Sequence, residues 1–196
     1  MNYLAHVFLA DNTPESLVGA LLGDFVKGAA KNNYAPVIQR NIELHRSIDS
    51  FTDAHPIVRA SKAEFTAERR RFAGVLLDIF FDHYLAKHWA SFSPIALPSF
   101  TTNVYEALQA HHEILPEKLQ RMLPFMRAED WLGSYARIEW IEVTLQRMAR
   151  RLRRGEMLAN GGEELRRNYG KFEADFRRFF PDLIAFARGS VQYEGR

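Results

Sequence analysis

The sequence contains no cysteine among its 196 residues. This absence excludes disulfide bonds, zinc sites with thiolate ligands and catalysis by a thiol nucleophile. No apolar run approaches the roughly 20 residues that a membrane-spanning helix needs. The first residues, MNYLAHVFLADN, lack a basic segment, and His6 interrupts their apolar stretch, so they are not typical of a signal peptide. We therefore expect a cytoplasmic protein with no segment inserted in a membrane.

Charge is nearly balanced, with 26 Lys and Arg against 24 Asp and Glu, but it is unevenly distributed. Residues 1–120 hold 13 acidic and 11 basic side chains, whereas residues 121–196 hold 11 acidic and 15 basic ones. A basic second half is compatible with an anionic partner and equally with ordinary solvated helix faces. No nucleic-acid-binding motif is visible, so we expect no nucleic acid partner. The sequence does not determine the oligomeric state.

Helical periodicity runs through most of the chain, and prolines divide it into segments. Thr13 and Pro14 fit the N-cap and first position of a helix that ends near Gly28. Further helices are predicted over residues 36–55, 56–71, 72–90, 100–113, 116–126, 129–152, 156–169 and 171–188, with a loop over 91–99 and a break at 160–162. These features predict an all-α protein with a single domain over residues 1–196. Residues 1–95 would form its core helices, and residues 96–196 would add helices or a C-terminal subdomain.

Two of these segments are expected to be buried. The helix predicted over 72–90 is apolar on most sides, which is typical of a central helix. Aromatic side chains recur at helical spacing in the last segment, and we interpret them as core residues: Tyr169, Phe172, Phe176, Phe179 and Phe180.

Acidic side chains occur where a purely solvated surface is not expected. His45, Asp49 and Asp53 are four residues apart and therefore lie along one stripe of a helix. Asp78 and Asp82 repeat that spacing within VLLDIFFDHYL. An ionised carboxylate among large apolar side chains is costly unless it is paired or binds a metal.

Three further groups extend this set: His6 in NYLAHVFLA, Asp24 in GALLGDFVKG, and His83 directly after Asp82. Imidazole and carboxylate ligands without thiolates favour Mn²⁺, Mg²⁺ or Fe²⁺ and also allow Zn²⁺. Ligand pairs spaced by one helical turn are a common way to build a metal site inside a helical bundle. Such a site polarises a phosphoryl oxygen and lowers the pKa of a bound water. The sequence therefore predicts metal-assisted hydrolysis of a phosphoester.

Each residue taken alone has a simpler explanation. His6 fits a core histidine, His45 with Asp49 fits a surface hydrogen bond, and Asp53 fits the end of a helix. Asp78 and Asp82 are harder to explain in this way, because the residues between them are bulky and apolar.

Four separated motifs resemble one known family. NYLAH at 2–6, GALLGDFVKG at 19–28, HRSIDSFTD at 45–53 and DIFFDHYLAKHW at 78–89 are similar to motifs of the acyl carrier protein phosphodiesterases. The resemblance implies an all-α fold that diverges from the HD-type metal-dependent phosphohydrolases. It also implies hydrolysis of the phosphodiester between 4′-phosphopantetheine and a serine of holo-acyl carrier protein, with a divalent metal, typically Mn²⁺.

The resemblance and the spacing together suggest roles for individual residues. Asp24 matches a family position tied to metal-dependent catalysis, and the other matching positions are His45, Asp49, Asp78, Asp82 and His83. From spacing and expected burial, we predict a metal site of Asp24, His45, Asp49 and Asp82, with Asp78 and His6 as further ligands or supporting groups. His83 or a free carboxylate is a candidate for proton transfer.

Basic residues would bind the substrate. Acyl carrier proteins are small and acidic, so an arginine-rich surface would steer them. Candidate patches are Arg69-Arg70-Arg71 and residues 147–154. Lys27 and Arg46 either neutralise the phosphate or only balance nearby acids. We expect aromatic side chains of residues 72–90 to line a channel for the pantetheine arm.

Two other hypotheses remain open at this point. The chain could be an HD-type hydrolase of a nucleotide or another small phosphoester. It could also be a non-enzymatic helical module that binds an acidic protein, with the His/Asp cluster as a structural metal site or a buried polar network.

Overall fold

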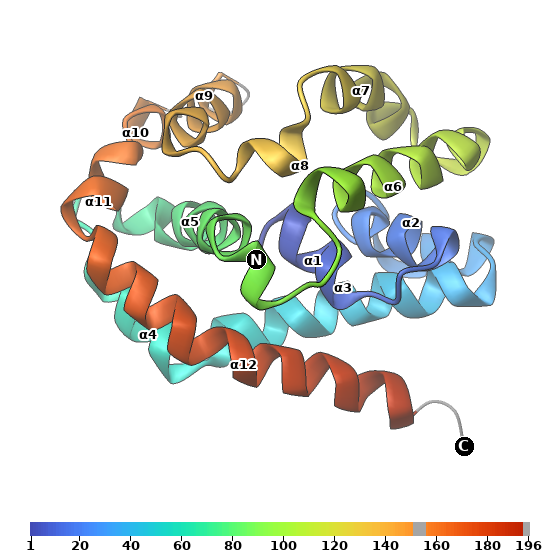
Figure 1. Cartoon of the computed structure of the whole chain (residues 1–196), viewed down its shortest axis with the longest axis horizontal. Coiled ribbons are helices and arrows are strands. Elements are labelled where there is room, and N and C mark those ends of the chain that lie inside the picture. The colour runs from blue at the N-terminus through green and yellow to red at the C-terminus, as the bar shows by residue number, and fades with distance from the viewer. Residues whose placement is uncertain (151–155, 194–196) are drawn as a thin grey trace.

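The structure is a computed structural model that describes residues 1–150 and 156–193. Helices alone make up the regular structure of these two ranges, which confirms the all-α prediction (Figure 1). The α-helices are α1 (Tyr3–Leu9), α2 (Pro14–Leu22), α3 (Pro36–Ala54), α4 (Pro56–Ala63), α5 (Ala73–Lys87), α6 (Leu97–Ala110), α7 (Glu117–Ala128), α8 (Trp131–Ser134), α9 (Ile138–Ala149), α10 (Glu156–Ala159), α11 (Gly162–Arg167) and α12 (Tyr169–Tyr193). Short 3-10 turns lie between some of them, including Gly28–Asn33 and Arg70–Phe72.

Helix starts follow the local chemistry of the sequence. The side chain of Thr13 accepts a hydrogen bond from the backbone N–H of Ser16, and Pro14 begins α2. Pro36 and Pro56 likewise occupy the first positions of α3 and α4. A proline at this position loses no helical hydrogen bond, because the first N–H groups of a helix have no partner within it.

Several predicted boundaries were wrong. The helix predicted over 56–71 ends at Ala63, and α6 already begins at Leu97 inside the predicted loop. The helix predicted over 129–152 is two helices, α8 and α9; Asp130 precedes α8 with a left-handed φ of 43°, and its side chain accepts a hydrogen bond from the N–H of Gly133. Residues 151 and 152 of that prediction lie outside the described ranges. The break predicted at 160–162 is confirmed, because it separates α10 from α11.

Helix α5 is central, as its apolar composition predicted. It packs against α1, α4, α9 and α12, and Figure 1 shows it between α9 and α10 on one side and α4 and α12 on the other. Besides Ala73 and Ala86, its buried side chains are Leu76, Leu77, Ile79, Phe80, Phe81, Asp82, His83, Tyr84 and Leu85. Asp82 and His83 therefore point into the interior and not to solvent, which makes their partners informative.

The long helix α12 closes one side of the molecule and packs on α3, α4 and α5 (Figure 1). Phe172, Phe176, Phe179 and Phe180 are fully buried, which confirms that they are core residues. Their rings meet those of other helices; Phe81 and Phe176, for example, lie 5.7 Å apart edge to face. No helix within the described residues has the length and apolar character needed to cross a membrane.

Candidate metal centre

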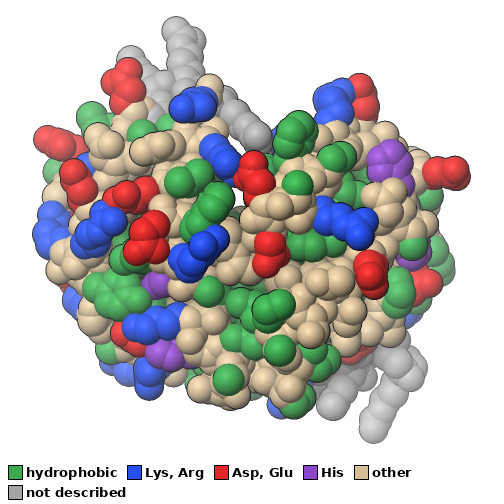
Figure 2. All heavy atoms as spheres, turned by 45° about the horizontal axis from the view of Figure 1, so that its top comes forward, with side chains coloured by type: hydrophobic (Ala, Val, Ile, Leu, Met, Phe, Trp, Pro, Cys, Tyr) green, Lys and Arg blue, Asp and Glu red, His purple; other side chains and the backbone are tan. Residues whose placement is uncertain are grey.

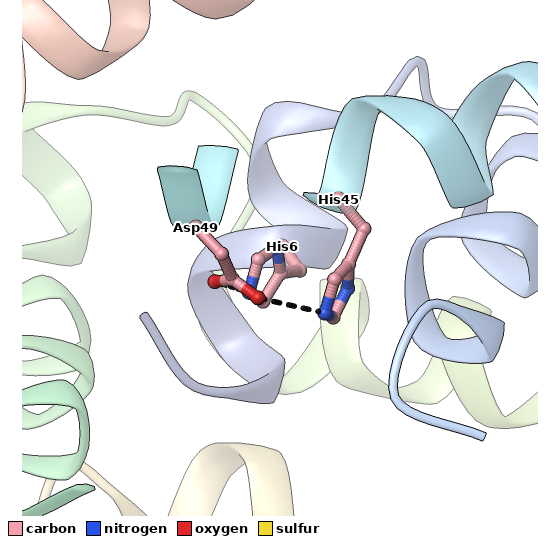
Figure 3. A group of neighbouring side chains, drawn as sticks. All are labelled: His6, His45 and Asp49. Atoms are coloured by element: carbon pink, nitrogen blue, oxygen red, sulfur yellow. Dashed lines mark ion pairs between the residues drawn. The ribbon is translucent and has the colours of Figure 1, made fainter. Parts of the chain in front are cut away.

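Helices α1 and α3 bring two histidines and one aspartate together (Figure 3). One ligand atom from each of His6, His45 and Asp49 lies within 4.8 Å of the others. The two imidazole rings stack with centroids 3.5 Å apart, and the Asp49 carboxylate lies beside both. Its Oδ1 is 3.1 Å from Nε2 of His6, and its Oδ2 is 3.4 Å from Nε2 of His45. The cluster thus combines the predicted His45–Asp49 pair of α3 with His6 from α1.

The orientation of His45 is fixed by the backbone of α2. Its Nδ1 donates a hydrogen bond of 2.7 Å to the carbonyl oxygen of Ala20. Nε2 is then left to face Asp49 and Asp24, whose Oδ1 is 3.5 Å away. Burial disfavours the charged ring, but the hydrogen bonds to Asp24 and Asp49 outweigh it and raise the pKa of His45 to about 9. Metal-binding histidines typically have this arrangement, in which one nitrogen donates to a carbonyl and the other faces the ion.

His6 is held in its neutral form. Burial, only partly opposed by Asp49, lowers the pKa of His6 to about 4. Its Nε2 faces Asp49 and the carbonyl oxygen of Met1, while its buried Nδ1 has no hydrogen-bond partner among the described residues. The hydrogen bonds from the two histidines outweigh desolvation and hold the pKa of Asp49 below its usual range. A neutral imidazole and an ionised carboxylate are the protonation states that a metal ion requires.

An acidic pocket of about 380 Å³ opens beside this cluster. Its walls include Asp24, Asp49, Asp53 and Asp78. The amino group of Met1 lies at its edge, 3.0 Å from Oδ1 of Asp78 and 3.6 Å from Oδ1 of Asp49. The structure therefore brings Asp24 and Asp78 to the same pocket as Asp49. Asp53 is the most exposed of the four, and it accepts a hydrogen bond from Nζ of Lys62.

Asp82 has a different environment from the other acidic residues. Its carboxylate is fully buried and accepts hydrogen bonds from the N–H groups of Asn2 (3.2 Å) and Leu4 (2.8 Å). These donors belong to the first turn of α1, whose own N-cap residue makes no capping bond. Burial, only partly offset by the nearby Met1 amino group and these hydrogen bonds, raises the pKa of Asp82 to about 7. In this structure Asp82 fixes the start of the helix that carries His6.

His83 points away from the acidic pocket. Its Nδ1 donates to the carbonyl oxygen of Tyr135 at 2.7 Å, and its Nε2 is 2.8 Å from the hydroxyl of Tyr169. Burial lowers the pKa of His83. Both nitrogens thus have partners that join α5 to other helices, and proton transfer by His83 remains a prediction.

Gly23 has a packing role that the sequence did not reveal. A Cβ atom at this position would lie 2.2 Å from Cγ of His45, far inside ordinary contact. The GD pair at 23–24 is therefore explained by a glycine that admits the His45 ring, followed by an aspartate that faces it.

The predicted phosphate-binding residues lie elsewhere. The guanidinium of Arg46 donates to the carbonyl oxygen of Val26 at 2.7 Å, and the exposed Lys27 lines a different pocket. Lys118 of α7 instead lines the acidic pocket, and its Nζ lies 5.5 Å from the ring of Phe25. Sequence reasoning missed Lys118, because it stands in no motif and comes from a helix 94 positions after Asp24.

The two predicted arginine patches differ in what they offer a partner. Arg69 is engaged internally with Glu163 (2.9 Å) and the buried Glu164 (3.4 Å), whereas Arg70 and Arg71 are exposed. The second patch is described only for Arg147 and Arg150, since residues 151–154 lie outside the described ranges. Figure 2 shows Lys and Arg side chains interspersed with Asp and Glu on the face that it displays.

Comparison with known proteins identifies the family of this chain. The family model described as acyl carrier protein phosphodiesterase matches residues 1–183. The chain belongs to this family. Proteins named acyl carrier protein phosphodiesterase are similar to it over nearly their whole length. The one from Serratia proteamaculans is 38% identical, covering 96% of this chain and 98% of that protein. The one from Photorhabdus laumondii is 34% identical, covering 98% of each. The one from Escherichia coli O6:H1 is 36% identical, covering 94% and 96%.

No solved structure matches the chain. For this member of the acyl carrier protein phosphodiesterase family, the similarity to an HD-type fold therefore remains a prediction. The donor set itself fits a metal. It offers a correctly oriented His45 Nε2, a neutral His6, an ionised Asp49 and two further carboxylates at the pocket wall.

Proposed function

We propose that this chain hydrolyses the phosphodiester that joins 4′-phosphopantetheine to a serine of holo-acyl carrier protein. Water would add to phosphorus, and the bond from phosphorus to the serine oxygen would break. The serine hydroxyl of the apo-carrier protein and 4′-phosphopantetheine would be the products. Family membership over nearly the whole length supports the substrate, and the His6–His45–Asp49 cluster is the observation that supports the chemistry.

We propose that a divalent metal, Mn²⁺ as the first choice and Mg²⁺ or Fe²⁺ as alternatives, binds at His6, His45 and Asp49. Asp24 and Asp78 are the further carboxylates available to it from the pocket wall. When bound, such an ion polarises a phosphoryl oxygen and makes a water molecule more acidic. The absence of thiolates from the donor set agrees with a hard ion.

The protein's own residues would position the substrate. The carbonyl of Ala20 accepts from Nδ1 of His45 and so turns Nε2 toward the site, where it would lose its proton when an ion binds. Asp82 anchors the first turn of α1 and thereby positions His6. Lys118, at the pocket wall, would lie near the phosphate and offset the negative charge that increases there during reaction.

The deciding experiment is a mass assay for loss of the phosphopantetheine group. Purified protein would be incubated with holo-acyl carrier protein and Mn²⁺, with and without EDTA. Asp49→Asn and His45→Gln are expected to reduce the rate by at least about a hundredfold, because each removes a ligand of the proposed metal.

The chain offers matched controls for both variants. His55 and Asp182 form another histidine–aspartate pair, 3.4 Å apart, outside the acidic pocket. His55→Gln and Asp182→Asn should therefore keep wild-type activity. Cleavage of bis(4-nitrophenyl) phosphate without cleavage of the carrier protein would favour another phosphoester as substrate. Metal binding with no cleavage of either would favour the non-enzymatic module.

A further inference from the structure

A second pocket of about 310 Å³ adjoins the acidic one. The two pockets share four wall residues, which are Asn2, Tyr3, Lys118 and Met148. The shared walls place the two pockets side by side, so a ligand that bridges them would pass these four side chains. Lys118 lies at the junction of the two.

The second pocket is chemically unlike the first. Its walls come mainly from α7, α8 and α9, and they carry large apolar side chains: Met122, Trp131, Tyr135, Trp140 and Met148. Thr144, Ser134 and Arg147 add a few polar groups. Apolar walls with a small number of polar groups are typical of pockets that bind an organic ligand.

We propose that this second pocket is the subsite for the pantetheine arm, an inference that rests on the proposed function. From the phosphate, the arm continues through a CH2 group, a dimethyl-substituted carbon and a carbon with a hydroxyl group, and then through two amides to a thiol. The apolar walls suit its carbon skeleton, and the Thr144 hydroxyl suits its amides, whereas the Arg147 guanidinium is already ion-paired with Glu129. The phosphate would stay at the junction, next to Lys118 and the acidic pocket.

This subsite replaces our expectation that residues 72–90 line the channel. Phe80 and Phe81 are fully packed inside the core, and Trp89 is only 5% exposed. Trp89 instead lies against the rings of Phe8 and Phe100. The aromatic side chains free to contact an arm are thus Trp131 and Trp140, both half-buried in the second pocket.

A binding experiment tests the subsite independently of catalysis. The chain has three tryptophans, and two of them line this pocket. Pantetheine, which lacks the phosphate, would be titrated at millimolar concentration in the presence of EDTA. Tryptophan fluorescence of the wild type should change saturably, and the double variant Trp131→Phe, Trp140→Phe should show no such change. An unchanged wild-type signal would overturn the subsite.

A kinetic experiment tests the subsite with the whole substrate. Thr144→Phe should fill part of the pocket and raise KM for holo-acyl carrier protein at least about tenfold, which corresponds to 1.4 kcal/mol. Gln146→Phe, on the exposed side of α9, is the matched control. The rise in KM that Thr144→Phe causes should be about tenfold smaller with bis(4-nitrophenyl) phosphate, which has no arm, than with the carrier protein.

The outcomes separate the two hypotheses. If pantetheine changes the fluorescence but wild-type protein does not cleave holo-carrier protein, the proposed function fails and the subsite stands. If wild-type protein cleaves the substrate while pantetheine leaves the fluorescence unchanged and Thr144→Phe behaves like Gln146→Phe, the subsite is wrong and the proposed function stands.

Discussion

Replacing Gly23 by alanine should disturb the proposed metal centre through a single methyl group. The backbone at Gly23 is helical, with φ of −51° and ψ of −36°, so alanine is conformationally acceptable there. By backbone entropy alone, the substitution would stabilise the fold by about 0.4–1 kcal/mol. The new Cβ, however, would lie 2.2, 2.5 and 2.6 Å from Cγ, Cδ2 and Cβ of His45.

His45 has little freedom to move away from such a methyl group. Ordinary contact begins at 3.4 Å, so Cγ would have to shift by about 3.4 − 2.2 = 1.2 Å. The ring is stacked on His6 at 3.5 Å, and its Nδ1 is bonded to Ala20. Overpacking of this kind costs about 1–3 kcal/mol and the backbone entropy returns about 0.4–1 kcal/mol, so the central expectation is a net loss of about 1.3 kcal/mol. For a chain of this length, that loss lowers Tm by about 3–5 °C.

Metal affinity should fall more than stability does. Ligand atoms must lie within about 0.2 Å of their preferred distance from an ion, and a shift of about 1 Å in the His45 ring removes that match. We expect the Kd for Mn²⁺, measured by titration calorimetry, to rise about 10–100-fold in Gly23→Ala.

Gly170→Ala is the control for this experiment. A Cβ at Gly170 in α12 would meet no atom within 4 Å, so this variant should melt at or slightly above the wild-type temperature and bind Mn²⁺ normally. The reasoning is refuted if Gly23→Ala binds Mn²⁺ within twofold of the wild type and melts no lower than Gly170→Ala.

Three further predictions concern charge. In EDTA, the free energy of unfolding should fall by about 1–3 kcal/mol as pH rises from 6.5 to about 9, because the folded pKa of His45 lies above its unfolded value. Thermal melts should show this dependence on pH, and His45→Gln should flatten it. Asp82→Asn should flatten the loss of stability between about pH 4 and about pH 7 that the raised folded pKa of Asp82 causes. It should also weaken Mn²⁺ binding by loosening α1, because an amide accepts only one of the two hydrogen bonds from Asn2 and Leu4; an unchanged pH slope at unchanged affinity would contradict this. Arg69→Ala should lower Tm and leave KM for carrier protein unchanged, since Arg69 is already ion-paired within the protein. Arg71 is exposed, so Arg71→Glu should raise KM for carrier protein. Equal effects of the two variants on KM would count against this distinction.

Local patterns in the sequence were sufficient for most of the fold. Apolar spacing predicted the central α5 and the buried aromatic stripe of α12, because both depend on which side of a helix a residue occupies. Proline and threonine positions predicted the starts of α2, α3 and α4. The break between α8 and α9 was missed, since no glycine or proline marks residues 135–137.

The candidate site was predictable to the extent that it is local. The His45–Asp49 pair follows from one-turn spacing, and Asp24, Asp78 and His6 stood out as polar residues in apolar surroundings. The same reasoning could not separate a metal ligand from a residue that holds a helix in place. Asp82 met the same sequence criteria as Asp49, but it accepts hydrogen bonds from the first turn of α1.

The sequence by itself determined the all-α class, the family and the acidic, thiol-free character of the donor set. The tertiary structure decided which of these groups meet. It stacked His6 on His45, and the absence of a side chain at Gly23 left room for the His45 ring. It also brought Lys118 to the acidic pocket and formed the apolar pocket beside it. The physical reason is that helical spacing fixes neighbours only within one helix. Contacts between helices depend on how their faces pack, and a single sequence gives no local signal for that packing.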